Sequence, residues 1–140
     1  MGIVIRMRDL NTLNRNGLLK PLVFCSPTLE QTNHAVPLNI PLAEKLITVN
    51  PKRRTMRMEQ CVKHVLEQFP DGVLIKDFDV MFNPKYEIDI LLMFIALYKN
   101  KPFDIIWPGR YENGKLIYAD SGYKDYRVYD IAQYDITCVI

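Results

Sequence analysis

The stretch from Val73 to Trp107, VLIKDFDVMFNPKYEIDILLMFIALYKNKPFDIIW, decides the fold class. It opens with a short apolar run, Val73–Ile75, and closes with a second one, Phe103–Trp107. Between them, Asn83-Pro84 turns the chain, and the apolar segment from about Tyr86 to Lys99 predicts a helix. Short, continuous apolar strands separated by a helix are typical of a parallel sheet with helices on its faces. We therefore expect an α/β fold.

The rest of the chain repeats this alternation and then changes character. Apolar residues spaced three and four apart predict an amphipathic helix that ends near Phe69, with Thr55 as its cap. Residues 1–20 predict only a short strand or helix and a loop containing Asn14 and Asn16. Near the carboxyl terminus, Asn113-Gly114 predicts a hairpin. We expect one domain over residues 1–140: a mainly parallel sheet flanked by helices, with antiparallel hairpin strands at its C-terminal end.

The composition indicates a globular protein, with 49% hydrophobic and 24% charged residues. The net charge of +2 is too small to indicate nucleic-acid binding by itself. Three cysteines, Cys25, Cys61 and Cys138, lie in apolar surroundings without paired spacing, which favours buried free thiols. The first residues carry charge too early for a secretory signal, and the longest apolar run, Ile90–Tyr98, is too short to span a membrane. These features predict a cytoplasmic protein.

The first candidate site is the junction between the apolar strand around Leu22–Phe24 and the helix that follows it. In α/β proteins, a strand-to-helix junction is where a phosphate-binding loop lies. This junction has no glycine and no lysine, and Pro27 removes one N–H donor. Only the hydroxyls of Ser26 and Thr28 remain as candidate nucleotide ligands. Thr28 and Gln31 also form a capping-box pattern, which would explain the helix start without any ligand.

The second candidate site follows the strand Val73–Ile75, where Asp77 and Asp79 alternate with Phe78. A carboxylate at the end of a buried strand can bind the hydration shell of magnesium or orient an attacking water. Asp77 and Asp79 are therefore the candidate catalytic residues. The alternative interpretation is a solvated strand end that happens to be acidic.

Three sequence blocks together resemble the BrxF family, small P-loop proteins of type 3 bacteriophage-exclusion (BREX) systems. They are PLNIPLAEKL (37–46), VLIKDFDVMFNP (73–84) and IIWPGRYENGKLIYADSGYKDYRVY (105–129). The resemblance covers roughly residues 36–130, and Trp107-Pro108-Gly109 is its most distinctive part. It implies a P-loop NTPase-like fold, ATP and magnesium as ligands, a role in phage defence, and other BREX proteins as partners, including the methyltransferase.

The chain departs from the family pattern at both nucleotide motifs. The family's Walker A loop, GxxGxGK[ST], would follow Leu22–Phe24, where this chain has neither glycine nor lysine. Alignment of the second motif puts Lys76 at the position of the magnesium-binding acid, Asp77 at an amide position and Asp79 at a glutamate position. The resemblance with these departures predicts a degenerate member that acts through protein–protein interaction rather than as an enzyme. The alternatives are an ATP-binding accessory NTPase and a DNA-contacting adaptor.

The dense basic cluster Lys52, Arg53, Arg54 and Arg57 is the candidate DNA contact. A solvated loop or a contact with an acidic protein partner is the alternative. Six tyrosines fall between positions 111 and 134, a composition that suits an interaction surface or base stacking. We favour the interaction surface.

His64 and Glu67 have a spacing seen in metal sites, but His34 is the only other histidine. The sequence therefore predicts no metal site.

Overall fold

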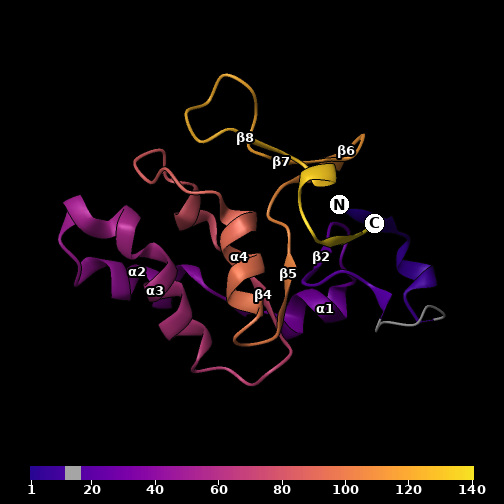
Figure 1. Ribbon diagram of the computed structural model, residues 1–140, viewed down its shortest axis with the longest axis horizontal. Helices are drawn as coiled ribbons and strands as arrows, with labels where there is room; N and C mark the ends of the chain where they lie inside the picture. The colour runs from indigo at the N-terminus through magenta and orange to yellow at the C-terminus, as the bar shows by residue number, and fades with distance from the viewer. Residues whose placement is uncertain (12–16) are drawn as a thin grey trace.

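Two β-sheets and four α-helices make up the fold in the computed structural model, which describes residues 1–11 and 17–140 (Figure 1). The larger sheet is entirely parallel and has helices against it, and a separate antiparallel sheet lies near the C-terminal end of the chain. The α/β class expected from the alternating strands and helices is confirmed. Asn14 and Asn16, expected in a loop, lie outside the described residues.

Sheet A, the larger sheet, has six parallel strands in the order β1-β9-β2-β5-β4-β3. Their bounds are Ile3–Ile5 (β1), Thr137–Val139 (β9), Leu22–Phe24 (β2), Phe103–Ile106 (β5), Val73–Lys76 (β4) and Val36–Pro37 (β3). Val23 is paired with Cys138 on one side and with Ile105 on the other. Since every strand runs the same way, all six carboxyl ends meet at one edge of the sheet.

Three helices cover one face of sheet A. They are α2 (Asn39–Ile47), α3 (Arg54–Leu66) and α4 (Ile90–Tyr98). The strand residues that point toward them, including Val23, Ile75 and Ile105, are completely buried. Figure 1 shows these helices on one side of β5 and α1 on the other.

The second face of sheet A is covered more thinly. Leu22, Phe24 and Ile106 point toward it and form a second, smaller apolar cluster. The elements next to this face are α1 (Leu29–His34) and the amino-terminal segment with its 3₁₀-helix η1 (Met7–Asp9). Strands buried on both faces explain why the sequence shows continuous apolar runs instead of alternation.

Two helix starts differ from those expected from the sequence. Asn50 caps a 3₁₀-helix, η3 (Pro51–Arg53), which leads directly into α3, whereas the hydroxyl of Thr55 donates to the carbonyl of Lys85. The expectation that Thr55 caps α3 is therefore wrong. Helix α4 begins at Ile90 rather than Tyr86, because Asp89 supplies the side-chain oxygen that accepts the free N–H of Leu92.

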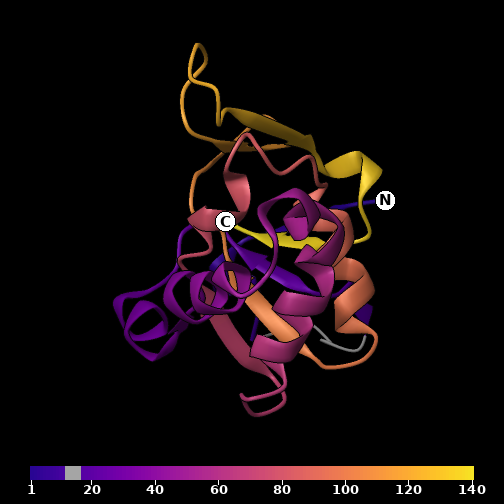
Figure 2. The same cartoon turned by 90° about the vertical axis from the view of Figure 1, so that its left-hand side faces the viewer.

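Sheet B is a three-stranded antiparallel sheet that lies beyond the carboxyl edge of sheet A (Figures 1 and 2). Its strands are β6 (Arg110–Glu112), β7 (Lys115–Tyr118) and β8 (Arg127–Asp130). Asn113 and Gly114, with φ of 48° and 76°, join β6 to β7. Two successive residues with positive φ are the signature of the tight hairpin turn that the Asn-Gly pair predicts.

Candidate functional site

The carboxyl edge of sheet A is the candidate site, because ligands of open α/β sheets bind outside the carboxyl ends of the strands. Strands β2, β5 and β4 are neighbours there, and Trp107, directly after β5, donates its backbone N–H to the carbonyl of Phe24 at 3.0 Å. Ser26 follows β2, and Asp77 follows β4. The fold thus brings the two sequence-predicted regions to the same edge, with Trp107 between them.

The junction between β2 and α1 is closed by its own side chains. The Thr28 hydroxyl accepts the backbone N–H of Gln31 at 3.1 Å, and the Gln31 amide oxygen accepts the N–H of Thr28 at 2.9 Å. The predicted capping box is therefore confirmed. These contacts use N–H groups and a hydroxyl that a phosphate would need, and α1 is only six residues long.

The two candidate carboxylates, Asp77 and Asp79, are both exposed and lie on one turn after β4. Asp77 has a φ of 49°, a left-handed conformation that is uncommon for a residue with a side chain. Asp79 begins the 3₁₀-helix η4 (Asp79–Phe82), and its carboxylate accepts a hydrogen bond from the Tyr118 hydroxyl at 3.1 Å. Asp79 therefore ties the end of β4 to sheet B.

Lys76, which the family resemblance places at the position of a metal-binding acid, contacts α1 in the structure. Its ammonium donates to the carbonyl of Thr32 in α1 at 2.8 Å. This hydrogen bond joins β4 to α1 across the second face of the sheet. The lysine side chain is thus held at α1 rather than at the turn that carries Asp77 and Asp79.

Aromatic side chains fill the space between the two sheets. Trp107, which is 3% exposed, makes edge-to-face contacts with Phe82 and Tyr129, each at 5.7 Å between ring centroids. Its indole N–H donates to the carbonyl of Ile117 in β7 at 3.0 Å. Phe82 also stacks on Tyr118, with centroids 3.7 Å apart and rings within 7° of parallel. Side chains therefore fill the carboxyl edge near β4 and β5 and hold the two sheets together. We call this contact between the sheets the joint.

The tyrosine-rich segment is divided between this joint and the surface. Tyr129 is buried, Tyr118 and Tyr134 are half-buried, and the Tyr134 hydroxyl donates to the Asp89 carboxylate at 2.6 Å. Tyr123, in contrast, is 68% exposed. The interpretation of all six tyrosines as one interaction surface is therefore corrected: alternation along β7 and β8 turns part of the set inward.

The same tyrosines predict a loss of stability at high pH. Burial raises the pKa of Tyr118 and of Tyr129 to about 12, and the Asp79 carboxylate adds to the rise at Tyr118. Burial, followed by the hydrogen bond to Asp89, raises the pKa of Tyr134. The folded state therefore keeps protons that the unfolded chain releases near pH 10. The free energy of unfolding should fall as the pH rises from about 10 to about 12.

Urea unfolding at a series of pH values above 9 measures this slope. Tyr129→Phe should make the slope shallower, whereas Tyr123→Phe, at an exposed tyrosine, should leave it as in the wild type. Equal slopes in Tyr129→Phe and the wild type would contradict the assignment.

The basic cluster is not a single unit. Lys52, Arg53 and Arg57 are exposed, but Arg54 is half-buried, and its Nε–H donates to the carbonyls of Leu46 and Val49 at the end of α2. A cation at a helix carboxyl terminus satisfies free carbonyls and interacts favourably with the helix dipole. The Arg54 side chain thus caps α2, and its contact with DNA stays a prediction.

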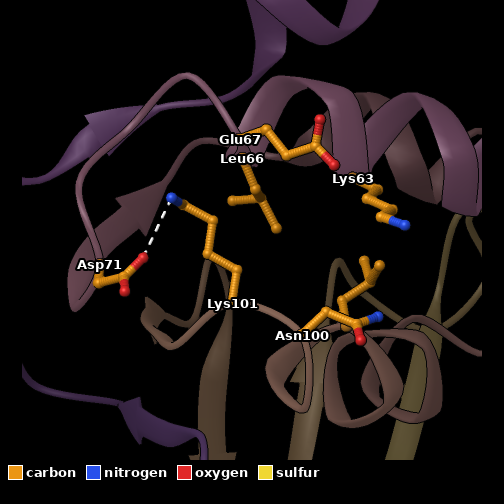
Figure 3. A pocket seen from close by; sticks show the side chains of 7 residues that line it. Lys63, Leu66, Glu67, Asp71, Asn100 and Lys101 are labelled. Atoms are coloured by element: carbon orange, nitrogen blue, oxygen red, sulfur yellow. Dashed lines mark hydrogen bonds and ion pairs between the residues drawn. The ribbon is translucent and has the colours of Figure 1, made fainter.

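A cavity of about 210 Å³ lies at the opposite, amino-terminal edge of sheet A, between α3 and the connection from α4 to β5 (Figure 3). Its charged lining residues are of both signs, and Lys101 forms an ion pair with Asp71 at 3.2 Å. Its seven lining residues are Lys63, Leu66, Glu67, Asp71, Leu97, Asn100 and Lys101. They come from separate segments and share no motif, so no sequence signal could have identified this cavity.

The cysteines form no disulfide in the described part of the chain. Cys61 and Cys138 are buried, but Cys25, expected to be buried as well, is only partly so because it follows the last residue of β2. A hydrogen bond with Cys25 and burial raise the pKa of Cys138.

His64 and Glu67 acquire no further ligand, since residues 1–11 and 17–140 contain no group of three or more potential metal ligands. Over the same residues, none of the helices combines the length and the apolar character needed to cross a membrane. None of the protein-family models, curated proteins or solved structures compared with the chain matches it.

Proposed function

We propose that the chain is a non-catalytic component of a bacteriophage-exclusion system of the BREX type, and that it acts by binding other proteins of that system. The proposal rests on the resemblance of residues 36–130 and on one structural observation. The carboxyl edge of sheet A, where a nucleotide would bind in this fold class, is packed with side chains that join the two sheets.

A phosphate site needs several N–H donors that converge on open space. Here the N–H of Gln31 is taken by Thr28, and the Asp79 carboxylate is taken by Tyr118. Trp107, which follows the neighbouring strand β5, packs against Phe82 and Tyr129 at the same edge. The α/β scaffold is complete, and side chains fill its carboxyl edge near β4 and β5. This arrangement supports a role that depends on the outer surface of the protein.

Helix α2 offers an apolar surface for such a role. Ile40 and Ile47 are 72% and 76% exposed, and Ala43, also exposed, lies between them on the same helix face. A cavity of about 200 Å³ adjoins this face and is lined in part by Val80 and Tyr86. Exposed apolar side chains that gather on one face favour contact with another protein. We assign the partner protein to this α2 face.

Titration of the protein with magnesium-ATP should give no heat of binding. The reason is the absence of a loop with convergent N–H donors after β2. Isothermal titration calorimetry measures this directly. Micromolar binding would overturn the non-catalytic assignment, and so would ATP turnover in the assembled complex that is lost in Asp79→Ala.

Co-purification from cells that express the neighbouring defence genes tests the protein–protein role. The wild-type chain should retain its partner, and the double variant Ile40→Asp with Ile47→Asp should lose it. Leu29→Asp changes a leucine that is 77% exposed on α1, so it is the matched control and should retain the partner. Retention by both variants would remove the α2 face from the proposal.

A further inference from the structure

One face of α3 carries a line of cationic and polar side chains. Arg57, Gln60 and His64 are three and four residues apart in α3, and Arg53 directly precedes the helix; all four are exposed. Residues with this spacing lie along one side of a helix. At 1.5 Å per residue, the line from Arg57 to His64 extends for about 10 Å.

Helix α2 lies beside this line and completes a groove. One cavity, of about 210 Å³, is lined by residues of both helices, including Lys45, Thr48 and His64. A second cavity, of about 250 Å³, shares Lys45 and Thr48 and extends along the helices to Gln68. The two cavities share Lys45 and Thr48, and together we call them the α2–α3 groove.

The polar groups of the first cavity are mostly hydrogen-bond donors. Lys45 and Arg57 are cations, and Thr48, Gln60 and His64 can each donate a hydrogen bond. No carboxylate lines the first cavity, whereas Glu44 lines the second. This part of the surface is therefore suited to an anion.

The cations of the groove are not neutralised within the described chain. The ion pairs formed among residues 1–11 and 17–140 do not include the groove cations Lys45 and Arg57, or Arg53 next to the groove. Burial raises the pKa of the Cys61 thiol at the floor of the groove, and the charges of Lys45 and Arg57 oppose that rise. Both positive charges thus act on the same point inside the groove.

The position of these cations is unfavourable for the helix itself. The first turn of α3 contains no acidic residue, and it carries Arg54 and Arg57 at the end where the helix dipole is positive. Arg54 is explained by its hydrogen bonds at the end of α2, whereas Arg57 donates a hydrogen bond to the side chain of Gln60 at 3.4 Å. A bound polyanion would compensate for the repulsion that Arg57 and Arg53 experience.

We propose that the α2–α3 groove binds the phosphate backbone of a duplex nucleic acid without reading its sequence. A line of about 10 Å matches roughly three phosphates of one strand along a duplex axis. Thr48 and Gln60 are side chains of the kind that donate hydrogen bonds to phosphate oxygens. The groove lining contains no aromatic residue, so it lacks the stacking platform that binders of single strands use.

This binding site is independent of the proposed partner protein. Lys45 and Thr48 face the groove, whereas Ile40 and Ile47 lie on another side of α2. The two surfaces can therefore be changed separately. Failure of one proposal leaves the other intact.

Fluorescence anisotropy with a labelled DNA duplex of mixed sequence tests the proposal. The double variant Arg53→Glu with Arg57→Glu should bind on the order of tenfold or more weakly, and the slope of log affinity against log salt should decrease by about 2. Lys63→Glu reverses a charge that does not line the groove and lies in the cavity of Figure 3, and this variant should bind within about twofold of the wild type. The double variant should unfold at the same urea concentration as the wild type or a higher one, because acidic side chains stabilise the amino-terminal end of a helix.

Two further measurements identify the ligand. A duplex of RNA should bind as DNA does, since both present a phosphate backbone. Equal losses of DNA affinity in Lys63→Glu and the double variant would overturn the proposal, because the affinity would then depend on the net charge of the protein and not on the groove. Tighter binding of single-stranded DNA than of duplex would overturn it, and so would competition by equimolar inorganic phosphate, which would indicate a site for a small anion.

Discussion

Trp107→Ala should lower the free energy of unfolding by about 3–5 kcal/mol, the range for removal of a large buried aromatic side chain. Trp107 is 3% exposed and lies between sheet A and sheet B. Its ring contacts Phe78, Phe82 and Tyr129, and its indole N–H satisfies the carbonyl of Ile117. Removal would leave a cavity at the joint and a buried carbonyl without its donor.

Trp107→Phe separates these two contributions. Phenylalanine keeps an aromatic ring against Phe82 but cannot donate to Ile117, so the loss should be about 1–3 kcal/mol. Urea unfolding followed by circular dichroism is the suitable measurement, because both variants remove the chain's one tryptophan and its fluorescence. If the alanine variant were no less stable than the phenylalanine variant, packing at Trp107 would not hold the sheets together.

Gly109→Ala should have the second-largest effect. Overpacking at this position should lower the free energy of unfolding by about 1–3 kcal/mol or more. A Cβ atom at position 109 would lie 1.9 Å from the carbonyl oxygen of Ile117 and 3.0 Å from the indole nitrogen of Trp107. No flexible side-chain end can yield to relieve the first contact, since the oxygen belongs to the backbone of β7. The strand would have to move and would lose its hydrogen bond with Trp107.

Gly17→Ala is the matched control, because a Cβ atom there would have no neighbour within 4 Å. Its free energy of unfolding should stay close to that of the wild type. Gly109→Ala and Trp107→Phe both act on the carbonyl of Ile117. The double variant should therefore lose less stability than the sum of the losses in the two single variants. Full additivity of the two losses would contradict the close approach of Gly109 to the backbone of β7. Equal stability of Gly109→Ala and Gly17→Ala would contradict it as well.

These two predictions bear on the proposed function through the carboxyl edge of sheet A. Trp107 and Gly109 belong to the most distinctive block of the family resemblance, and both join sheet B to sheet A. If Trp107→Ala loosens this joint, the edge that is now packed would open to solvent. Loss of the bound partner protein in that variant, together with retained partner in Gly17→Ala, would link the joint to partner binding.

Local signals in the sequence were sufficient for much of the fold. The apolar runs at Leu22–Phe24 and Val73–Ile75 predicted buried parallel strands, and both form. The Thr28–Gln31 pattern predicted a capping box, and the Asn113-Gly114 pair predicted a hairpin. Each of these features depends on residues a few positions apart, so the chain near them carries the whole physical cause.

Features that depend on a neighbouring element could not be predicted in this way. The sequence assigned the cap of α3 to Thr55, but the entry into that helix is set by Asn50 and η3. It grouped Arg54 with exposed cations, although Arg54 caps a different helix. A pattern of residue types does not record which surface a side chain meets.

Residue patterns were enough to predict the α/β class and the lack of a glycine-rich loop after β2. They did not indicate that Trp107 packs between the two sheets, that Asp79 is held by Tyr118, or that Lys45 and Arg57 line one groove. The difference lies in how far apart in the chain the interacting residues are. Strand runs, caps and turns are local preferences, whereas a packed edge or a groove exists only once segments distant in the chain lie side by side.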